Sequence, residues 1–120
     1  MSEPIALTLP VPPSINHYWR NFRGRTVVSA DGREYKEKVA AICIRYQIPM
    51  LLDEVAVTVR IYRKARRGDI DNFMKVLLDS LRGYVYKDDS QIIQLHVYRF
   101  DDKANPRAEV EVKDMAWRLL

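Results

Sequence analysis

The stretch VAVTVRIYRKARRGDIDNFMKVLLDSLRG, residues 55–83, decides the fold class of this chain. Its first half alternates apolar side chains with others at every second position, which is typical of a strand. The apolar positions of this strand are Val55, Val57, Val59 and Ile61. In its second half the apolar residues are spaced as on one face of a helix, predicted over residues 69–82 with Gly83 just past its end. The positions on that face are Phe73, Val76, Leu77 and Leu81.

The flanking sequence predicts a second helix and three further strands. Alternation at residues 5–9 predicts a strand that ends at the prolines of residues 10–13, because proline cannot donate to a ladder. Residues 14–28 are typical of a long polar and aromatic loop with a turn at residues 23–25. Residues 93–97 and 110–112 predict two late strands, with hairpin-loop residues at 101–106 between them.

The earlier helix is expected to begin after Ser29, a favourable N-cap residue, and to stop before Pro49. One face of this helix carries Tyr35, Val39, Ile42 and Tyr46. The resulting order is strand, helix, strand, helix and hairpin, without an internal repeat or a linker. This order predicts a single α+β domain over residues 1–120, in which a small mixed, largely antiparallel sheet of about four strands packs against two helices.

Composition excludes several classes of protein. The chain is 48% apolar and 30% charged, as in ordinary globular proteins and unlike disordered ones. Its one cysteine, Cys43, excludes a disulfide framework and a cysteine-based zinc site, and its place beside the apolar helix face predicts a core residue. No segment approaches the ~18 apolar residues of a membrane span, and the first residues do not resemble a signal peptide. We therefore expect a cytoplasmic protein without a membrane partner.

Basic residues outnumber acidic ones, 20 to 16, and they are clustered. Such clusters favour a polyanionic partner, with an ordinary solvated surface as the alternative. One cluster contains Arg60, Arg63, Lys64, Arg66 and Arg67, and the other contains Arg20, Arg23 and Arg25.

Carboxylates and a lysine are concentrated at the start of the helix predicted over residues 69–82. Asp69 and Asp71 lie at its first turn, and Lys75 follows Asp71 by four residues and so shares its face. A further pair, Asp88 and Asp89, precedes the third strand. If that loop returned to the start of the helix, the carboxylates would converge into a site of hard oxygen ligands suited to Mg²⁺ or Mn²⁺. Helix capping, an i,i+4 ion pair and a simple turn are the alternative explanations.

Three motifs occur in order along the chain. Asp69, Asp71, Asn72 and Lys75 form the pattern Asp-x-Asp-Asn-x-x-Lys, directly after Arg66 and Arg67. Residues 12–16 read Pro-Pro-Ser-Ile-Asn, and residues 88–91 read Asp-Asp-Ser-Gln. Together they resemble the RusA family of Holliday-junction resolvases over nearly the whole chain. The sequence departs from the best-known form of the family at Gly68, where an arginine is expected.

This resemblance implies a small homodimeric endonuclease, from a bacterium or its phage, that resolves four-way DNA junctions by paired symmetric nicks. It implies Mg²⁺ as cofactor, with Mn²⁺ as a substitute, bound by Asp69, Asp71 and Asp89. It also implies that these aspartates and Lys75 are the catalytic residues, whereas Asp88 matches the family pattern less well. The nicks would leave 5′-phosphate and 3′-hydroxyl ends. The residues expected to contact DNA are Arg20, Arg23, Arg25, Lys64, Arg66 and Arg67.

Two other functions stay open on the sequence alone: a basic DNA-binding module without catalysis, and a metal-dependent nuclease acting on other branched DNA. The dimer surface is also open. The candidates are the helix that carries Tyr35 and Tyr46 and the apolar residues 115–120, each of which could equally be core. His17 and His96 receive no role.

Overall fold

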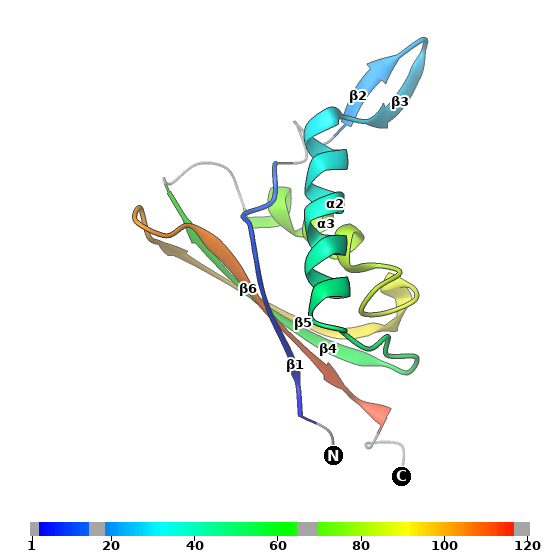
Figure 1. Ribbon diagram of the computed structural model, residues 1–120, viewed down its shortest axis with the longest axis vertical. Coiled ribbons are helices and arrows are strands. Elements are labelled where there is room, and N and C mark those ends of the chain that lie inside the picture. The colour runs from blue at the N-terminus through cyan, green and yellow to red at the C-terminus, as the bar shows by residue number, and fades with distance from the viewer. Residues whose placement is uncertain (1–2, 15–18, 65–69, 117–120) are drawn as a thin grey trace.

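The computed structural model of the chain describes residues 3–14, 19–64 and 70–116. Two helices, α2 (Ala30–Arg45) and α3 (Ile70–Leu81), and a short 3₁₀ helix, η1 (Asp89–Gln91), accompany the strands (Figure 1). The strands are β1 (Ile5–Leu9), β2 (Trp19–Phe22), β3 (Arg25–Val28), β4 (Val55–Arg63), β5 (Ile92–Asp101) and β6 (Arg107–Asp114). None of the helices in the described ranges is long and apolar enough to cross a bilayer.

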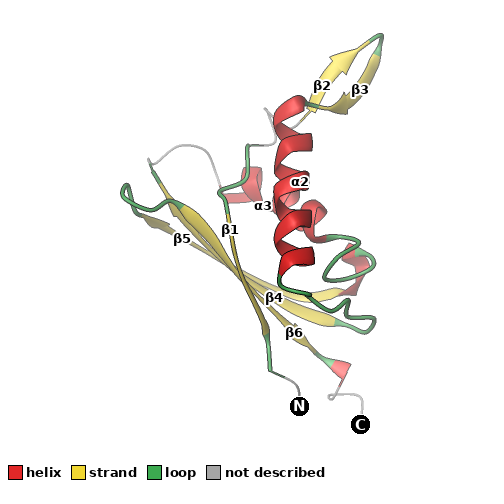
Figure 2. Cartoon of the chain, in the orientation of Figure 1, coloured by secondary structure: helices red, strands yellow, loops and turns green. Residues whose placement is uncertain are grey.

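The main sheet has four strands in the order β1-β6-β4-β5. The β1–β6 and β6–β4 pairs are antiparallel and the β4–β5 pair is parallel. The two helices lie along the sheet in Figure 2. This arrangement confirms the predicted α+β class and the mixed, largely antiparallel sheet.

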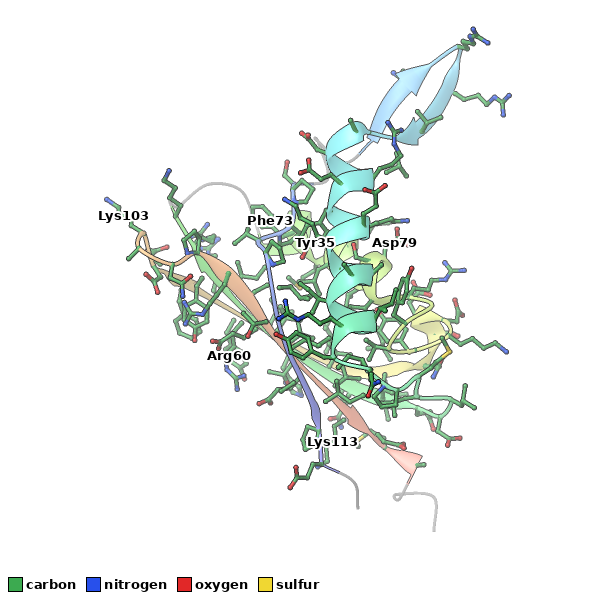
Figure 3. The ribbon with its side chains drawn as sticks, viewed as in Figure 1. Tyr35, Arg60, Phe73, Asp79, Lys103 and Lys113 are labelled. Atoms are coloured by element: carbon green, nitrogen blue, oxygen red, sulfur yellow. The ribbon has the colours of Figure 1, made fainter. Side chains whose placement is uncertain are left out.

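The core lies between the two helices and one face of the sheet. Strand β4 supplies alternate buried residues, from Val55 to Ile61, to the same cluster as Val39 of α2 and Leu77 of α3. Burying a side chain of this size contributes roughly 1.5–3 kcal/mol, so this face holds the domain together. Cys43 belongs to the cluster, as the sequence predicts. The other face of β4, which includes Arg60, is turned away from the helices (Figure 3).

Helix α2 begins where the sequence predicts. The Ser29 hydroxyl accepts a hydrogen bond of 3.1 Å from the backbone N–H of Gly32 and so caps the helix. Tyr35 is buried, and its hydroxyl donates to the carbonyl oxygen of Pro10 at 2.8 Å. The prediction that Tyr46 shares the core face is wrong, because the helix ends at Arg45 and Tyr46 is 63% exposed.

Residues 101–106 do not form a hairpin loop. Strands β5 and β6 are separated by β4 in the sheet, so this loop crosses the end of β4 instead of joining neighbours. The backbone N–H of Asp102 donates to the carbonyl oxygen of Arg63 at 2.8 Å, which ties the loop to that strand end. The Asp102 carboxylate accepts from the N–H groups of Ala104 and Asn105. The same turn-forming residues suit both a hairpin between neighbouring strands and a connection that crosses another strand. The sequence pattern could therefore not distinguish the two.

A hairpin does occur where the sequence predicts only a loop. Strands β2 and β3 pair antiparallel from Trp19 opposite Val28 to Phe22 opposite Arg25. Arg23 and Gly24 turn the chain with positive φ angles of 51° and 76°. The hairpin extends away from the sheet beyond the start of α2 (Figure 1).

Strand β4, helix α3 and strand β5 form a β-α-β unit. Because β4 and β5 are parallel neighbours, the chain must return along α3 from the end of one strand to the start of the next. Helix α3 therefore begins near the C-terminal end of β4. The 3₁₀ helix η1 lies at the other end of the strands, where β5 begins. This topology positions the two groups of carboxylates that the sequence singled out.

Candidate active site

Helix α3 carries the central motif. Asp71 falls in its first turn and Lys75 in the next, so the i,i+4 spacing gives both residues the same face of the helix. The opposite face packs into the core through Val76, Leu77 and Leu81, and Lys75 is exposed. The helix is thus anchored by its apolar side, and it holds Lys75 toward solvent.

Several of the predicted residues lie outside the described ranges. Asp69, Arg66 and Arg67 fall within residues 65–69, between β4 and α3. Their assignment as metal ligand and DNA contacts therefore stays a prediction.

The loop before β5 is fixed by Gln91. Its side-chain carbonyl accepts hydrogen bonds from the backbone N–H groups of Lys87 and Asp88, at 2.7 and 2.9 Å. Its amide donates to the carbonyl oxygens of Leu51 and Asp53, at 2.9 and 2.8 Å. Gln91 therefore ties η1 both to its own loop and to the segment that leads into β4. The sequence motif contains this glutamine, but nothing in the pattern predicted that its side chain would join the loop to the segment before β4.

The two neighbouring aspartates of this loop have different environments. Asp88 accepts a hydrogen bond of 2.5 Å from the Ser90 hydroxyl and lies 3.7 Å from the Arg82 guanidinium. The hydrogen bond from Ser90, with Arg82 as a smaller contribution, lowers the pKa of the Asp88 carboxyl. Asp89 is exposed at the start of η1. Asp88 is thus engaged within the loop, whereas the Asp89 side chain is exposed.

The loop returns to the C-terminal end of α3 and not to its start. The Tyr86 hydroxyl donates to the carbonyl oxygen of Leu78, and Arg82 contacts Asp88. Figure 3 labels Phe73 and Asp79, which mark the two ends of this helix on opposite sides of α2. From Asp71 to Leu81 the helix rises about 15 Å, at roughly 1.5 Å per residue. The loop before β5 thus lies near the end of α3 that is farther from Asp71.

No group of three histidine, cysteine, aspartate or glutamate side chains suited to a metal ion occurs among the residues that the structure describes. The candidate ligands are aspartate carboxylates, and Mg²⁺ and Mn²⁺ prefer such oxygen ligands. The aspartates fit such a metal in kind.

The basic residues occupy three places. Arg23 and Arg25 are exposed on the β2–β3 hairpin, and Arg20 lies in β2. Lys64 is exposed just after β4. Arg63, by contrast, is only 4% exposed and pairs with Asp101 at 3.3 Å, so it belongs to the sheet. Among the described residues of the cluster at 60–67, Arg63 is therefore not part of an exposed basic surface.

A stack of side chains at the strand ends was missed by sequence reasoning. The Arg107 guanidinium lies 3.8 Å from the ring centroid of Tyr62, and the Tyr62 ring stacks on Phe100 with centroids 5.1 Å apart. These residues come from three strands, so no local pattern could have indicated their contact. Arg107 also pairs with Asp102 and Glu109, each at 3.0 Å.

Comparison with known proteins identifies the family. The family model described as Endodeoxyribonuclease RusA matches residues 10–113. The chain belongs to the RusA family. A RusA protein of Escherichia coli strain K12, named crossover junction endodeoxyribonuclease, is 35% identical over 114 residues, which cover 92% of this chain and 94% of the relative. Its namesake from Enterobacteria phage 82 is 34% identical over 113 residues, covering 91% and 93%.

Membership in the RusA family confirms the resemblance predicted from the three motifs, and it makes this chain an endodeoxyribonuclease by family. The match covers β4, α3, η1 and β5, the segments that carry Lys75 and the aspartates.

Proposed function

We propose that this chain is a Mg²⁺-dependent endodeoxyribonuclease that resolves Holliday junctions by paired symmetric nicks, in recombination and repair. The observation that carries the proposal is the placement of Asp71 and Lys75 on one face of an anchored helix, within a chain of the RusA family. The relatives from Escherichia coli and phage 82 are named for action on crossover junctions. The DNA of a bacterial cell lies in the cytoplasm, where we expect the protein to act.

Asp69, Asp71 and Asp89 would hold the metal ion, and Mn²⁺ would substitute for Mg²⁺ since both prefer carboxylate oxygens. When bound there, the ion would supply Lewis acidity that activates water and offsets negative charge on the phosphate. In its absence the aspartates would repel one another and the DNA backbone. Metal and junction should therefore bind cooperatively.

Lys75 is placed to act on the reacting phosphate. Its exposed ammonium group lies one helical turn beyond Asp71, so it would offset the charge that develops in the transition state or orient the nucleophile. In-line attack by water at phosphorus would break the bond to the 3′ oxygen, which takes up a proton. The products would be a 5′-phosphate and a 3′-hydroxyl, ends that a ligase can join.

Basic residues outside the reacting centre would position the junction. Arg20, Arg23 and Arg25 belong to the hairpin, which extends from the body of the domain (Figure 1), whereas Lys64, Arg66 and Arg67 precede α3 in the sequence. Contacts of this kind to phosphate fix the position of DNA without reading its sequence.

The proposed active species is a homodimer. A four-way junction has approximate two-fold symmetry, and clean resolution needs two cuts in strands of like polarity. A dimer with two-fold symmetry supplies two equivalent sites related in the same way.

The test is incubation of a synthetic four-way junction with the protein in Mg²⁺, in Mn²⁺ and in EDTA. Symmetric nicks that require the metal support the proposal. Binding without cleavage in either metal would instead indicate a DNA-binding module. Efficient cleavage of flaps or three-way junctions, with four-way junctions left intact, would indicate a nuclease for other branched DNA.

A further inference from the structure

The face of the main sheet that is turned away from the helices carries polar and aromatic side chains. Both helices pack against the opposite face, through the core (Figure 2). Arg60 marks the outer face in Figure 3. On this face, the register of β4 and β5 places three pairs of residues side by side: Thr58 with His96, Arg60 with Tyr98, and Tyr62 with Phe100. These side chains therefore border solvent instead of the core.

An open hollow of about 410 Å³ lies on this outer face. Its lining residues are Thr58, Arg60, His96, Tyr98 and Phe100. Sites that hold small ligands in proteins measure roughly 300–1,000 Å³. Two aromatic side chains of the lining are accessible, since Tyr98 is 49% exposed and Phe100 is 44% exposed. The hollow thus has the size of a ligand site and offers two aromatic rings.

One of these rings is held in a fixed orientation. Phe100 stacks on Tyr62, with ring centroids 5.1 Å apart and 23° between the ring planes. The Arg107 guanidinium lies 3.8 Å from the centroid of the same Tyr62 ring. Arg107 is in turn held by Asp102 and Glu109. A side chain that is already ordered loses little conformational entropy when a ligand binds.

The charge of the hollow suits an anionic ligand. Arg60 and His96 are its basic residues, and none of the five described lining residues is acidic. Arg60 lies 3.9 Å from Glu111, but so long and exposed an ion pair contributes little. The guanidinium has five donor groups, so it can bind a phosphate as well. Glu109 and Glu111 belong to β6, which lies on the other side of β4 from β5.

Aromatic rings beside a basic side chain are typical of surfaces that bind single-stranded nucleic acid. Every nucleobase has a flat face that stacks on an aromatic ring, and every nucleotide carries a phosphate. Sheet faces with exposed aromatic residues bind unpaired bases in this way. The stack of Tyr62 and Phe100 also lies at the C-terminal end of β4, near which α3 begins. DNA bound at the start of α3 would therefore be close to this end of the sheet.

We propose that the outer face of the sheet binds unpaired bases of DNA, which stack on Tyr98 and Phe100 while Arg60 contacts a phosphate. This inference rests on the proposed function, because an opened junction crossover would supply the unpaired bases. A second copy of the chain is the alternative occupant. A two-fold contact centred on the hollow would place one hollow against the other and leave a space between the chains, whereas stable interfaces are closely packed.

The first test measures binding of a short single strand of thymidines by fluorescence anisotropy in EDTA. Tyr98→Ala and Phe100→Ala should each lower the affinity by about 5- to 150-fold, as for loss of one stacked base. Tyr46→Ala is the matched control, because Tyr46 is 63% exposed and lies outside the sheet. Unchanged affinity of both β5 variants overturns the proposal.

Two further substitutions at Tyr98 distinguish stacking from general apolar contact. Tyr98→Phe keeps the ring and should keep the affinity for the single strand. Tyr98→Leu keeps an apolar side chain without a ring and should lose affinity as Tyr98→Ala does. Wild-type affinity of Tyr98→Leu would contradict stacking.

The phosphate contact is tested by the salt dependence of binding. Arg60→Gln should lower the magnitude of the salt slope by about 0.7, the value for one phosphate of a single strand. Lys38→Gln, on an exposed lysine of α2, should leave the slope unchanged. An unchanged slope for Arg60→Gln would contradict the contact.

Photocrosslinking locates the strand on the wild-type protein, so it does not depend on how any variant folds. A single strand that contains 5-iodouracil is irradiated with the protein, and the crosslinked residues are identified by mass spectrometry. Crosslinks at Tyr98 or Phe100 support the proposal. Crosslinks found only elsewhere, such as on the β2–β3 hairpin, overturn it.

Sedimentation tests the alternative occupant. Tyr98→Ala and Phe100→Ala should sediment as the wild type does, and circular dichroism verifies that they are folded. A folded Tyr98→Ala protein that is monomeric where the wild type is dimeric would make this face an interface between copies, and the proposal would be wrong.

Failure of the proposed function gives a different result, because single-strand binding is measured without metal and without cleavage. If the wild type cuts four-way junctions and Tyr98→Ala and Phe100→Ala bind the single strand normally, only this inference fails. If the wild type cuts no branched DNA but loses single-strand affinity on these substitutions, the proposed function fails and the outer face remains a DNA-binding surface.

Discussion

Gln91 donates a hydrogen bond from its side-chain amide to the main-chain carbonyl oxygen of Leu51, at 2.9 Å. This bond joins the loop that presents Asp89 to the segment that precedes β4, 40 residues earlier in the chain. The position of an exposed aspartate is thus set by a partly buried amide two residues away. A rigid support of this kind is what a catalytic carboxylate needs, because small displacements reduce rates strongly.

Replacement of Gln91 tests this support. Gln91→Ala removes four hydrogen bonds, and it should lower the free energy of unfolding by about 2–4 kcal/mol, given a net contribution of roughly 0.5–1 kcal/mol for each bond. Junction cleavage should fall by about 10- to 100-fold because Asp89 is no longer held in position. Urea unfolding and single-turnover cleavage measure the two effects. Gln94→Ala, on an exposed residue of β5, is the control and should leave stability nearly unchanged.

Asp71→Asn should lower the cleavage rate by orders of magnitude, whereas folding and junction binding persist. The substitution removes a charged ligand with little change in shape, and binding should tighten slightly because repulsion of phosphate is reduced. Asp31→Asn is a matched control, since Asp31 also lies in the first turn of a helix, α2. Gel-shift affinity in EDTA and cleavage in Mg²⁺ distinguish the two properties. Undiminished cleavage by Asp71→Asn would remove this residue from the site.

Substitutions at Lys75 and at the preceding arginines should affect different quantities, namely the cleavage rate and the affinity for DNA. Lys75→Ala should lower the single-turnover rate by roughly 10²–10³ with little change in affinity, as expected for loss of a transition-state contact. The Arg66→Ala, Arg67→Ala double variant should bind more weakly, with a salt slope smaller by about 0.9 for each lost phosphate contact. Lys38→Ala, an exposed lysine of α2, is the control. Weaker binding by Lys75→Ala with an unchanged saturated rate would reverse these assignments.

Tyr35→Phe should destabilise the fold by about 1 kcal/mol, because the Pro10 carbonyl oxygen loses its hydrogen-bond donor. Tyr46→Phe, on the exposed tyrosine just past the same helix, should have little effect. Equilibrium unfolding in urea compares the two variants at neutral pH. Equal stability of both variants would show that the hydrogen bond to the Pro-Pro segment contributes little.

The same tyrosine predicts a dependence on alkaline pH. Burial raises the pKa of the Tyr35 hydroxyl above its ordinary value of 10.0. The unfolded chain therefore loses this proton first, so the contribution of Tyr35 is complete below about pH 10 and decreases as the pH rises further. Wild-type stability should fall more steeply than that of Tyr35→Phe above pH 10. Parallel pH profiles would contradict this expectation.

The sequence predicts the elements whose signals are local. Alternation in β4, the apolar face of α3 and the Ser29 cap are all found as expected, because each depends on residues a few positions apart. The pairing of strands is not local. Nothing in residues 92–114 indicates that β5 pairs with β4 in parallel while β6 lies on the other side, so the hairpin prediction failed.

In the candidate site, too, local features could be predicted from the sequence and distances between segments could not. The Asp-x-Asp-Asn-x-x-Lys pattern identified the helix that carries Asp71 and Lys75, and Asp89 was favoured over Asp88 by resemblance alone. The structure supplies a physical difference between the two, since Asp88 is engaged by Ser90 and Arg82. The distance between Asp71 and Asp89 depends on the direction of a strand, which no motif encodes.

Strand β6 lies between β1 and β4, although it comes last in the sequence among the described strands. Residues 5–9 find their partners only at residues 108–112. A chain emerging from the ribosome therefore leaves β1 and one edge of β4 unpaired until β6 has appeared. Such late, distant pairing slows folding and favours capture by chaperones or aggregation during translation. Because helix α3 packs against this sheet, we expect chains that lack β6 to have no cleavage activity.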